Sequence, residues 1–248
     1  MTLNLTISPD FSPDKFSGWY IFNTWLQRKL DVAIHLALYD SFAQQRQAIA
    51  EDRIDLIYAN PYDAAMLVRE KGFMALAHPA GLADEAVVAV NAGSAYQRTE
   101  DLQAGIRVAS TADPDVNMMG MIMLEPADLS PENVKSEICS SYILVAKQVM
   151  NGNADVGIFP ARAFDGFSSM IRGSLRPLVR SEISVVRHML LAGPKALSIL
   201  PALREALLSM PSDEKALPIL NDLGFSHWEV SSQEDVEFMI DLVDTLVS

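Results

Sequence analysis

The sequence is poor in cysteine, in basic residues and in long apolar runs. Its 248 residues include one cysteine, Cys139, which excludes an intrachain disulfide and a metal site built from several cysteines. No apolar run approaches the roughly 18 residues that a membrane-spanning helix needs. Only 19 basic residues stand against 32 acidic ones, and the net charge of −13 repels polyanions. We therefore expect no membrane insertion and no nucleic-acid partner.

Several motifs of known chemistry are also missing. The sequence has no G-x-G-x-x-G or G-x-x-x-x-G-K-[ST] loop for a nucleotide and no G-x-S-x-G elbow for a nucleophilic serine. Its four histidines show no H-x-x-x-H spacing. We therefore expect no cofactor, no metal and no catalytic residues. The chain as written also begins without the basic and then apolar pattern of a secretory leader, so we expect a cytoplasmic protein, or a periplasmic one if a leader was removed.

What is present is a regular alternation of strand-like and helix-like segments. Half of the residues are hydrophobic and 21% are charged, a composition that supports sizeable cores. Short β-like runs alternate with amphipathic helical runs, which is typical of parallel sheets flanked by helices. Strands are expected at residues 3–8, 32–39, 54–60, 85–90, 105–110, 134–138 and 154–160, followed by two extended runs within 174–193. The C-terminal part, with periodic apolar residues at 197–210, 217–223 and 236–246, is expected to be helical.

This order of elements predicts two lobes joined by two crossings, with a ligand cleft between them. The run at residues 85–90 is β-rich but has no helix directly after it, so we interpret it as a strand that crosses from one lobe to the other. The expected organisation is lobe 1 from residues 1–84 and 188–248, lobe 2 from residues 85–187, and hinge crossings near residues 84–90 and 179–188.

Four segments of the chain resemble one family. They are residues 7–67, residues 101–110 with the sequence DLQAGIRVAS, residues 140–165 from SSYILVAK to ARAFD, and residues 209–230. Together they look like the phosphate, phosphite and phosphonate (PhnD-like) substrate-binding proteins that serve ABC importers. The resemblance implies a type II periplasmic-binding-protein fold, in which each lobe is a mostly parallel α/β sheet. It also implies a small oxyanion or organophosphorus ligand trapped by hinge closure, and an ABC permease as partner.

The departures from the family concern its anion site. In the family, the strand that corresponds to residues 105–110 is followed by a hydroxyl-rich turn that opens a helix and receives the anion. This chain has Ser110 and Thr111 there, but then Asp113. We expect Asp113 or Asp115 to cap the helix with its own side chain, so that protein charge fills the place of ligand charge. Asp84 and Glu85 likewise stand where the family carries a tyrosine and a hydroxyl. These departures therefore lead us to expect an altered anion site and a ligand that is neutral, zwitterionic or cationic, or that has an apolar body and one polar end.

Candidate ligand-binding residues follow from topology, because ligands of open α/β sheets bind at the carboxyl ends of strands. Those in lobe 1 are Ser8, Asp10, Phe11, Tyr39, Asp40, Ser41, Asn60 and Tyr62. Those in lobe 2 are Asp84, Glu85, Ser110, Thr111, Asp113, Ser140, Ser141, Tyr142, Phe159 and Arg162.

Some of these residues have a purely structural interpretation as well. The tyrosines can pack against the core as readily as they stack on a ligand. Arg162 is the best-placed cation for a ligand carboxylate, or else forms a salt bridge on a helix face. Cys139 is expected to be a buried thiol, and the methionines at 118, 119, 121 and 123 are expected to fill apolar space instead of binding a soft metal.

Three functions agree with the sequence. The first is a solute-binding protein for an importer, and the second is a ligand sensor of the same fold with a signalling partner. The third is an enzyme of the kind that uses this fold in menaquinone or thiamine-precursor synthesis. The absence of a catalytic set favours binding without chemistry, so we expect a solute-binding protein that is not an enzyme.

Overall fold

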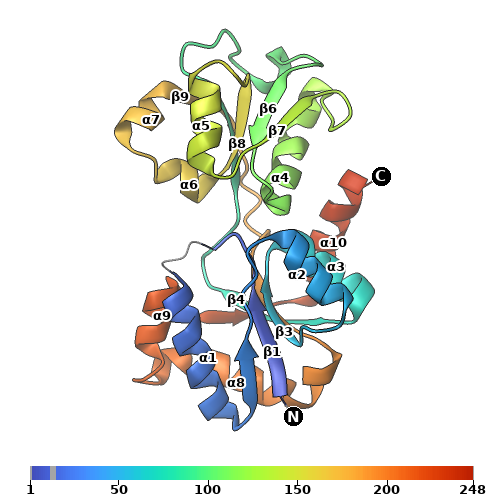
Figure 1. The fold of residues 1–248 in the computed structure, drawn as a ribbon, viewed down its shortest axis with the longest axis vertical. Coiled ribbons are helices and arrows are strands. Elements are labelled where there is room, and N and C mark those ends of the chain that lie inside the picture. The colour runs from blue at the N-terminus through green and yellow to red at the C-terminus, as the bar shows by residue number, and fades with distance from the viewer. Residues whose placement is uncertain (1, 12–14, 248) are drawn as a thin grey trace. The chain divides into compact units, whose positions relative to one another are not determined.

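The computed structural model describes residues 2–11 and 15–247, which form two compact units. Unit 1 contains the chain up to Leu82 and again from Arg187 to Val247, and unit 2 runs from Ala83 to Val186. Each unit is built around one sheet with helices on its faces (Figure 1). The expected α/β class, with two sheets flanked by helices, is confirmed.

Unit 1 has a six-stranded sheet in the order β11-β4-β10-β3-β1-β2. Strands β1, β2 and β3 are parallel, whereas β10 is antiparallel to β3 and β4, and β11 is antiparallel to β4. Its elements are β1 (Thr2–Ile7), α1 (Phe16–Leu30), β2 (Ala33–Leu36), α2 (Phe42–Ala50), β3 (Leu56–Ala59), α3 (Pro61–Lys71), β4 (Met74–Pro79), β10 (Met189–Ala192), a 3-10 helix (Pro194–Ile199), α8 (Leu200–Ser209), a 3-10 turn (Met210–Ser212), α9 (Leu217–Leu223), β11 (Trp228–Val230) and α10 (Gln233–Val247).

The core of unit 1 lies on both faces of this sheet. On one face α1 buries Trp19, Phe22 and Leu26, whose three- and four-residue spacing places them on one side of the helix. They pack with Trp228 and with apolar residues of α8 and α9. A second cluster, which includes Leu67 of α3 and Met239 of α10, covers the other face. The helical periodicity read from the sequence therefore identifies the buried side of α1 correctly.

Unit 2 has a five-stranded sheet in the order β7-β6-β8-β5-β9. Strands β6, β7 and β8 are parallel, and β5 is antiparallel to both β8 and β9. Its elements are β5 (Ala86–Asn91), a 3-10 turn (Thr99–Asp101), β6 (Arg107–Ser110), α4 (Pro114–Leu124), a 3-10 turn (Glu125–Ala127), β7 (Lys135–Ile138), α5 (Tyr142–Met150), β8 (Val156–Pro160), α6 (Ala161–Asp165), α7 (Ser169–Ser174) and β9 (Leu175–Arg180).

Helix α4 packs closely on the sheet of unit 2. A Cβ at Gly120 would lie 2.5 Å from the side chain of Ile158 on β8, so only glycine allows this approach. Met118 and Met119 are buried, and Met121 packs against the same core. Met123 packs against this core as well, so two of the four methionines fill apolar space as expected.

Several short elements of the structure have no recognisable pattern in the sequence. Strands β4 and β11 and helices α6 and α7 were not predicted, and β2 is shorter than the eight residues expected. Three to six residues are too few to show a clear hydrophobic period. Strand β2 lies at an edge of its sheet and has two exposed residues in four. Short strands of this kind are recognised only when the strands that pair with them are known.

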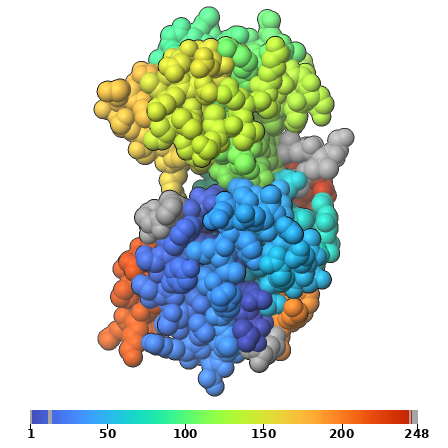
Figure 2. Space-filling model, viewed as in Figure 1, coloured from blue at the N-terminus to red at the C-terminus, as the bar shows by residue number. Residues whose placement is uncertain are grey.

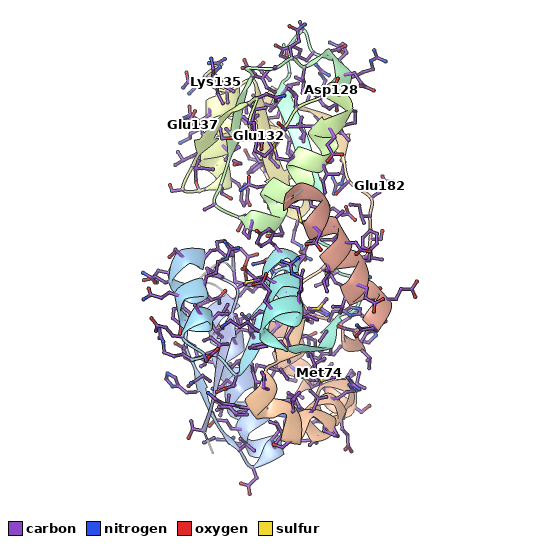
Figure 3. All side chains as sticks on the ribbon, turned by 90° about the vertical axis from the view of Figure 1, so that its right-hand side faces the viewer. Met74, Asp128, Glu132, Lys135, Glu137 and Glu182 are labelled. Atoms are coloured by element: carbon purple, nitrogen blue, oxygen red, sulfur yellow. The ribbon has the colours of Figure 1, made fainter. Side chains whose placement is uncertain are left out.

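The surfaces of both units are rich in charge. Figure 3 shows the side chains, among them Lys135 and Glu137 on the edge strand β7, where charged residues discourage edge-to-edge pairing.

In Figure 2, residues from the first quarter of the chain form most of the visible face of unit 1. Among the described residues, no helix combines the length and the apolar character that crossing a membrane requires.

Candidate functional site

The carboxyl ends of β6, β7 and β8 form one edge of the unit 2 sheet. Because these three strands are parallel, the residues that follow them are brought to the same edge. The segments concerned are residues 110–113 at the end of β6, residues 139–142 after β7 and residues 159–162 at the end of β8. The structure therefore gathers most of the candidate residues that the sequence assigned to lobe 2.

Asp113 and Tyr142 form a hydrogen-bonded pair at this edge. The hydroxyl of Tyr142, at the start of α5, donates to Oδ2 of Asp113, which is only 8% exposed. Burial, followed by the negative charge of Asp113 and this hydrogen bond, raises the pKa of Tyr142 well above its ordinary value. The phenol therefore remains protonated and acts as a donor to the carboxylate.

The expected capping of α4 by Asp113 is wrong. Asp113 occupies the N-cap position, but its side chain makes no hydrogen bond to the amides of the helix. The carboxylate instead meets Tyr142, which follows another strand. Tyr142 is partly buried, and its hydrogen bond compensates the carboxylate for part of the water that it loses on burial. Asp115 lies in the first turn of α4 and is also buried.

The turn between β6 and α4 is held by its own polar groups. The backbone N–H of Asp113 donates to Oγ1 of Thr111 over 3.4 Å, and Nδ2 of Asn117 donates to the carbonyl oxygen of Thr111 over 2.8 Å. The hydroxyl of Ser110 donates to the same carbonyl over 3.3 Å. Both hydroxyls thus make hydrogen bonds within the turn, which fixes the position of Asp113.

The residues after β7 and β8 have different environments. Ser141 caps α5 by accepting from the N–H of Leu144 over 3.4 Å, whereas Ser140 is exposed. Phe159 is fully buried, and its ring lies 6.4 Å from that of Tyr142. Arg162 is exposed on α6 and has no ion pair within residues 2–11 and 15–247. Arg162 is therefore the cation at this edge that is most accessible to a ligand.

Cys139 is a buried thiol, as expected. It is 8% exposed, and burial, followed by the charge of Glu137, raises its pKa. The neutral thiol is therefore favoured over the reactive thiolate.

Glu85 links the two segments that delimit unit 2. Its carboxylate accepts from the hydroxyl of Ser181 and, over 2.7 Å, from the N–H of Ser184. Nearby, the N–H of Ala86 donates to Oγ of Ser181 over 2.9 Å, and the N–H of Asp84 donates to the carbonyl of Val186 over 2.8 Å. Glu85 therefore has a structural role in joining these segments.

In unit 1, the parallel strands β1 and β3 also end side by side. Ser8, directly after β1, donates its N–H to the carbonyl of Tyr58 over 2.8 Å. Asn60, directly after β3, caps α3 by accepting from the N–H of Asp63 and donates to Oγ of Ser8 over 3.3 Å. Ser8 and Asn60 are fully buried, so this edge is rigidly built. Sequence reasoning missed Gln45 of α2, which donates to the carbonyl of Ile7 over 2.7 Å.

Asp10 forms an ion pair with His188, at the end of the second crossing. Oδ2 of Asp10 lies 2.9 Å from Nε2 of His188, and the side chains are 16% and 9% exposed. Burial by itself would raise the pKa of Asp10, but the charge of His188 and hydrogen bonds from His188 and Ser8 outweigh it and lower that pKa. Phe11 packs its ring 5.5 Å from those of Tyr58 and His188. His188 was missed because β10 enters the sheet antiparallel to β3, which brings its first residues to the carboxyl end of β3.

The remaining candidates of unit 1 lie around α2 and α3. Ser41 caps α2 by accepting from the N–H of Gln44 over 3.3 Å, and Asp40 is exposed. Tyr39 is partly buried against the core. The guanidinium of Arg46 lies 5.2 Å from the ring centre of Tyr62 and pairs with the buried Asp63 over 2.7 Å. These contacts fix α2 and α3 to each other and to the core of unit 1.

Comparison with known proteins identifies one family. A family model described as "ABC transporter, phosphonate, periplasmic substrate-binding protein" matches residues 5–236. No curated protein sequence matches the chain.

Solved structures share the fold at low sequence identity. XAC2383 from Xanthomonas citri bound to ATP has a TM-score of 0.83 at 16% identity, with 99% of this chain and 98% of that chain covered. PhnD1 from Prochlorococcus marinus in complex with methylphosphonate has a TM-score of 0.80 at 13% identity, with the same coverage. The periplasmic aliphatic sulphonate binding protein SsuA from Escherichia coli has a TM-score of 0.66 at 13% identity, with 99% of this chain and 86% of that chain covered.

These comparisons confirm the resemblance and the fold that the sequence suggested. The family consists of binding components of transporters, so the expectation of binding without catalysis is confirmed as well. A family of this kind implies a small-molecule ligand and an ABC permease as partner. Because the family match extends over almost the whole sequence, the chain belongs to the phosphonate-type periplasmic substrate-binding proteins of ABC transporters.

Proposed function

We propose that the chain captures a small solute that offers an N–H donor or a positive charge, in place of the phosphonate that gives the family its name. The observation that supports this proposal most directly is the hydrogen-bonded pair of the buried Asp113 and the partly buried Tyr142. Asp113 stands between β6 and α4, at the turn where the resemblance implies that the family receives its anion. A solute that binds there meets a carboxylate.

Electrostatics disfavours an anionic ligand at Asp113. Two like charges 4 Å apart repel by about 4 kcal/mol at an effective dielectric constant of 20. Tyr142 does not relieve this repulsion, because its raised pKa keeps it a neutral donor to Asp113. A carboxylate accepts up to about four hydrogen bonds, so a ligand ammonium or amide can share Asp113 with the phenol.

Arg162 supports a zwitterionic ligand over a simple cation. It follows β8, which is adjacent to β6 in the sheet, and its guanidinium is exposed. Arginine binds carboxylates with paired hydrogen bonds. A solute with an ammonium group for Asp113 and a carboxylate for Arg162, such as an amino acid, combines both interactions.

We also propose that candidate residues of unit 1 contact the ligand and that ligand binding drives closure of the two units. Ser8, Asp10 and Asn60 lie at or beside strand ends of that unit, as ligand contacts of this fold class do. Closure about the segments near residues 84–90 and 179–188 is expected to reduce the radius of gyration when the ligand binds. Small-angle scattering curves that superimpose with and without a saturating ligand would show that the units do not close.

The ligand class is tested by a thermal-shift screen followed by calorimetry. The panel contains methylphosphonate, inorganic phosphate, amino acids and simple amines. A ligand present at a hundred times its Kd stabilises the folded protein by about 2.7 kcal/mol. The expected result is stabilisation by an amino acid or amine, lost in Asp113→Asn and retained in Glu100→Gln, which removes an exposed acid of the same unit. Stabilisation of the unaltered protein by methylphosphonate alone would refute the proposed ligand class while leaving the transport role intact.

A further inference from the structure

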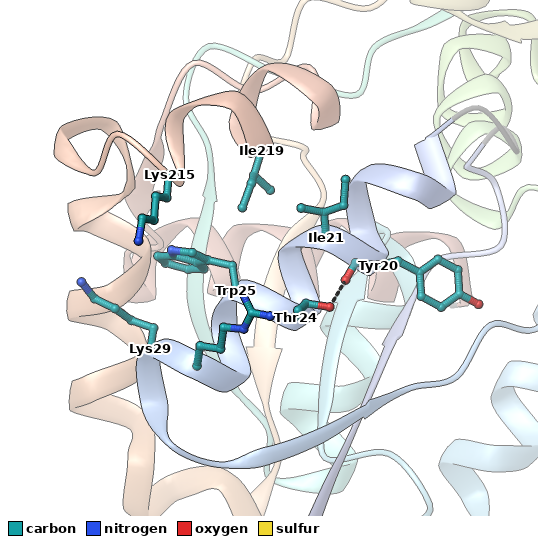
Figure 4. A pocket seen from close by; sticks show the side chains of 8 residues that line it. Tyr20, Ile21, Thr24, Trp25, Lys29, Lys215 and Ile219 are labelled. Atoms are coloured by element: carbon teal, nitrogen blue, oxygen red, sulfur yellow. Dashed lines mark hydrogen bonds between the residues drawn. The ribbon is translucent and has the colours of Figure 1, made fainter.

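Unit 1 contains a pocket that none of the strand-end residues line. It has a volume of about 510 Å³ and lies between α1 and α9, lined by Tyr20, Ile21, Thr24, Trp25, Arg28, Lys29, Lys215 and Ile219 (Figure 4). All of these residues belong to unit 1. Its size falls within the range of small-molecule sites, roughly 300–1,000 Å³.

The apolar part of the pocket is exposed to solvent. Tyr20 is 52% exposed and Ile21 is 47% exposed. Trp25 is partly buried, whereas the other two tryptophans, Trp19 and Trp228, are almost completely buried. Apolar side chains grouped in a concave surface and bordered by polar residues are typical of a ligand site.

The charged part of the pocket is basic. Arg28, Lys29 and Lys215 line it, and none of the described lining residues is acidic. One acid, Asp213, stands beside this lining: it pairs with Lys29 over 3.9 Å and accepts from the backbone N–H of Lys215 over 2.9 Å, so it offsets part of the positive charge. The three lining cations outnumber this single acid, so in a chain of net charge −13 the pocket is a local region of positive charge that attracts an anion.

We propose that this pocket binds an amphipathic monoanion, with an apolar body and one carboxylate. The body lies against Trp25, Ile21 and Ile219, and the carboxylate is bound by the ammonium groups of Lys29 and Lys215. Figure 4 shows these two lysines at the same end of the pocket, beside the indole of Trp25. The site is independent of the proposed solute site, since it lies on helices that carry none of the strand-end residues.

The test titrates the full chain with sodium octanoate, followed by isothermal calorimetry and tryptophan fluorescence. Octylammonium and octanamide serve as probes with the same apolar body and a different head group. We expect octanoate to bind at least about tenfold more tightly than either, because the charge-assisted hydrogen bonds are lost without the carboxylate. The fluorescence change should disappear in Trp25→Phe, since the other tryptophans are buried.

Two double variants separate the pocket from general charge effects. Lys29→Gln with Lys215→Gln should weaken octanoate binding by about tenfold or more. Lys135→Gln with Lys147→Gln removes the same charge from exposed sites of unit 2 and should leave binding unchanged. Ile21→Ser should weaken octanoate and octanamide alike, because it removes only apolar contact.

Three results would overturn the proposal. Equal affinity for octanoate and octylammonium would show that the basic residues do not select the head group. Unchanged octanoate binding in the Lys29 and Lys215 double variant would place the ligand elsewhere. An acidic amphipathic peptide that binds this pocket when octanoate does not would identify it as a protein-docking surface. Asp113→Asn is expected to leave octanoate binding intact. The experiment can therefore refute the octanoate pocket without bearing on the proposed solute site at Asp113.

Discussion

The phenol of Tyr142 donates a hydrogen bond to the buried carboxylate of Asp113, although 29 residues separate them in the chain. One follows β6 and the other follows β7, and the two strands are paired in parallel. The contact therefore depends on strand order and not on any local motif. It converts what the sequence suggests is a helix cap into a polar pair at the edge of the sheet.

Tyr142→Phe should destabilise the protein by about 1–3 kcal/mol, because the buried Asp113 loses a hydrogen-bond donor. The phenylalanine ring preserves the packing against Phe159. The free energy of unfolding is measured by urea denaturation. Tyr20→Phe, at an exposed tyrosine, should change it very little. Equal stability of the two variants would show that the phenol contributes nothing to holding Asp113.

Asp113→Ser should increase the affinity for methylphosphonate by at least tenfold, or about 1.4 kcal/mol. The change removes a negative charge and restores a hydroxyl at the turn, and the N-terminal end of α4 can then attract the anion. Calorimetry on both proteins measures the difference. If neither protein binds methylphosphonate, or if both bind it equally, Asp113 does not control the charge of the ligand.

How much of this structure can be predicted from the sequence depends on how far apart in the chain the contacting residues lie. Local periodicity is enough to identify α1 and its buried residues Trp19 and Phe22. It does not reveal the Asp10–His188 pair, whose members lie in distant segments brought together by an antiparallel strand. The pocket beside α1 likewise depends on Lys215, almost 200 residues away in the chain. Patterns within one segment do not report such contacts.

Glu85→Ala should destabilise unit 2 by about 1–3 kcal/mol, because the hydroxyl of Ser181 and the N–H of Ser184 lose their shared acceptor. Ser184 adopts a left-handed conformation with φ of 64°, which is unfavourable for a residue with a Cβ. The hydrogen bond from its amide to Glu85 helps to hold that conformation.

Hydrogen exchange measures the effect of Glu85→Ala locally. The amides of residues 181–186 should exchange faster in the variant, whereas those of the unit 2 sheet should be less affected. Glu182→Gln alters an exposed neighbouring acid and serves as the control. Unchanged exchange at residues 181–186 would contradict the linking role of Glu85.

Stability should fall as the pH is lowered below about 6.5, because His78 favours its neutral form in the folded protein. Burial of His78 on β4, followed by the charge of Arg187, lowers its pKa. The guanidinium of Arg187 contacts Nε2 over 2.8 Å, and Ser231 contacts Nδ1 over 3.3 Å. Glu229, 3.4 Å from Nε2, acts to raise the pKa of His78, but burial and Arg187 are the larger causes and lower it.

The sign of this effect follows from the order of protonation. The unfolded chain takes up the proton at His78 at a higher pH than the folded chain does. The contribution of His78 to stability is therefore complete above the unfolded pKa of about 6.5 and is lost as the pH falls through the lower folded pKa. Urea denaturation between about pH 7.5 and pH 5 should show this decline, and His78→Gln should reduce its slope. His35→Gln, at an exposed histidine of β2, should not. If His78→Gln does not fold, an NMR titration of the His78 ring in the unaltered protein decides the matter, since a pKa at or above 6.5 would contradict the buried neutral form.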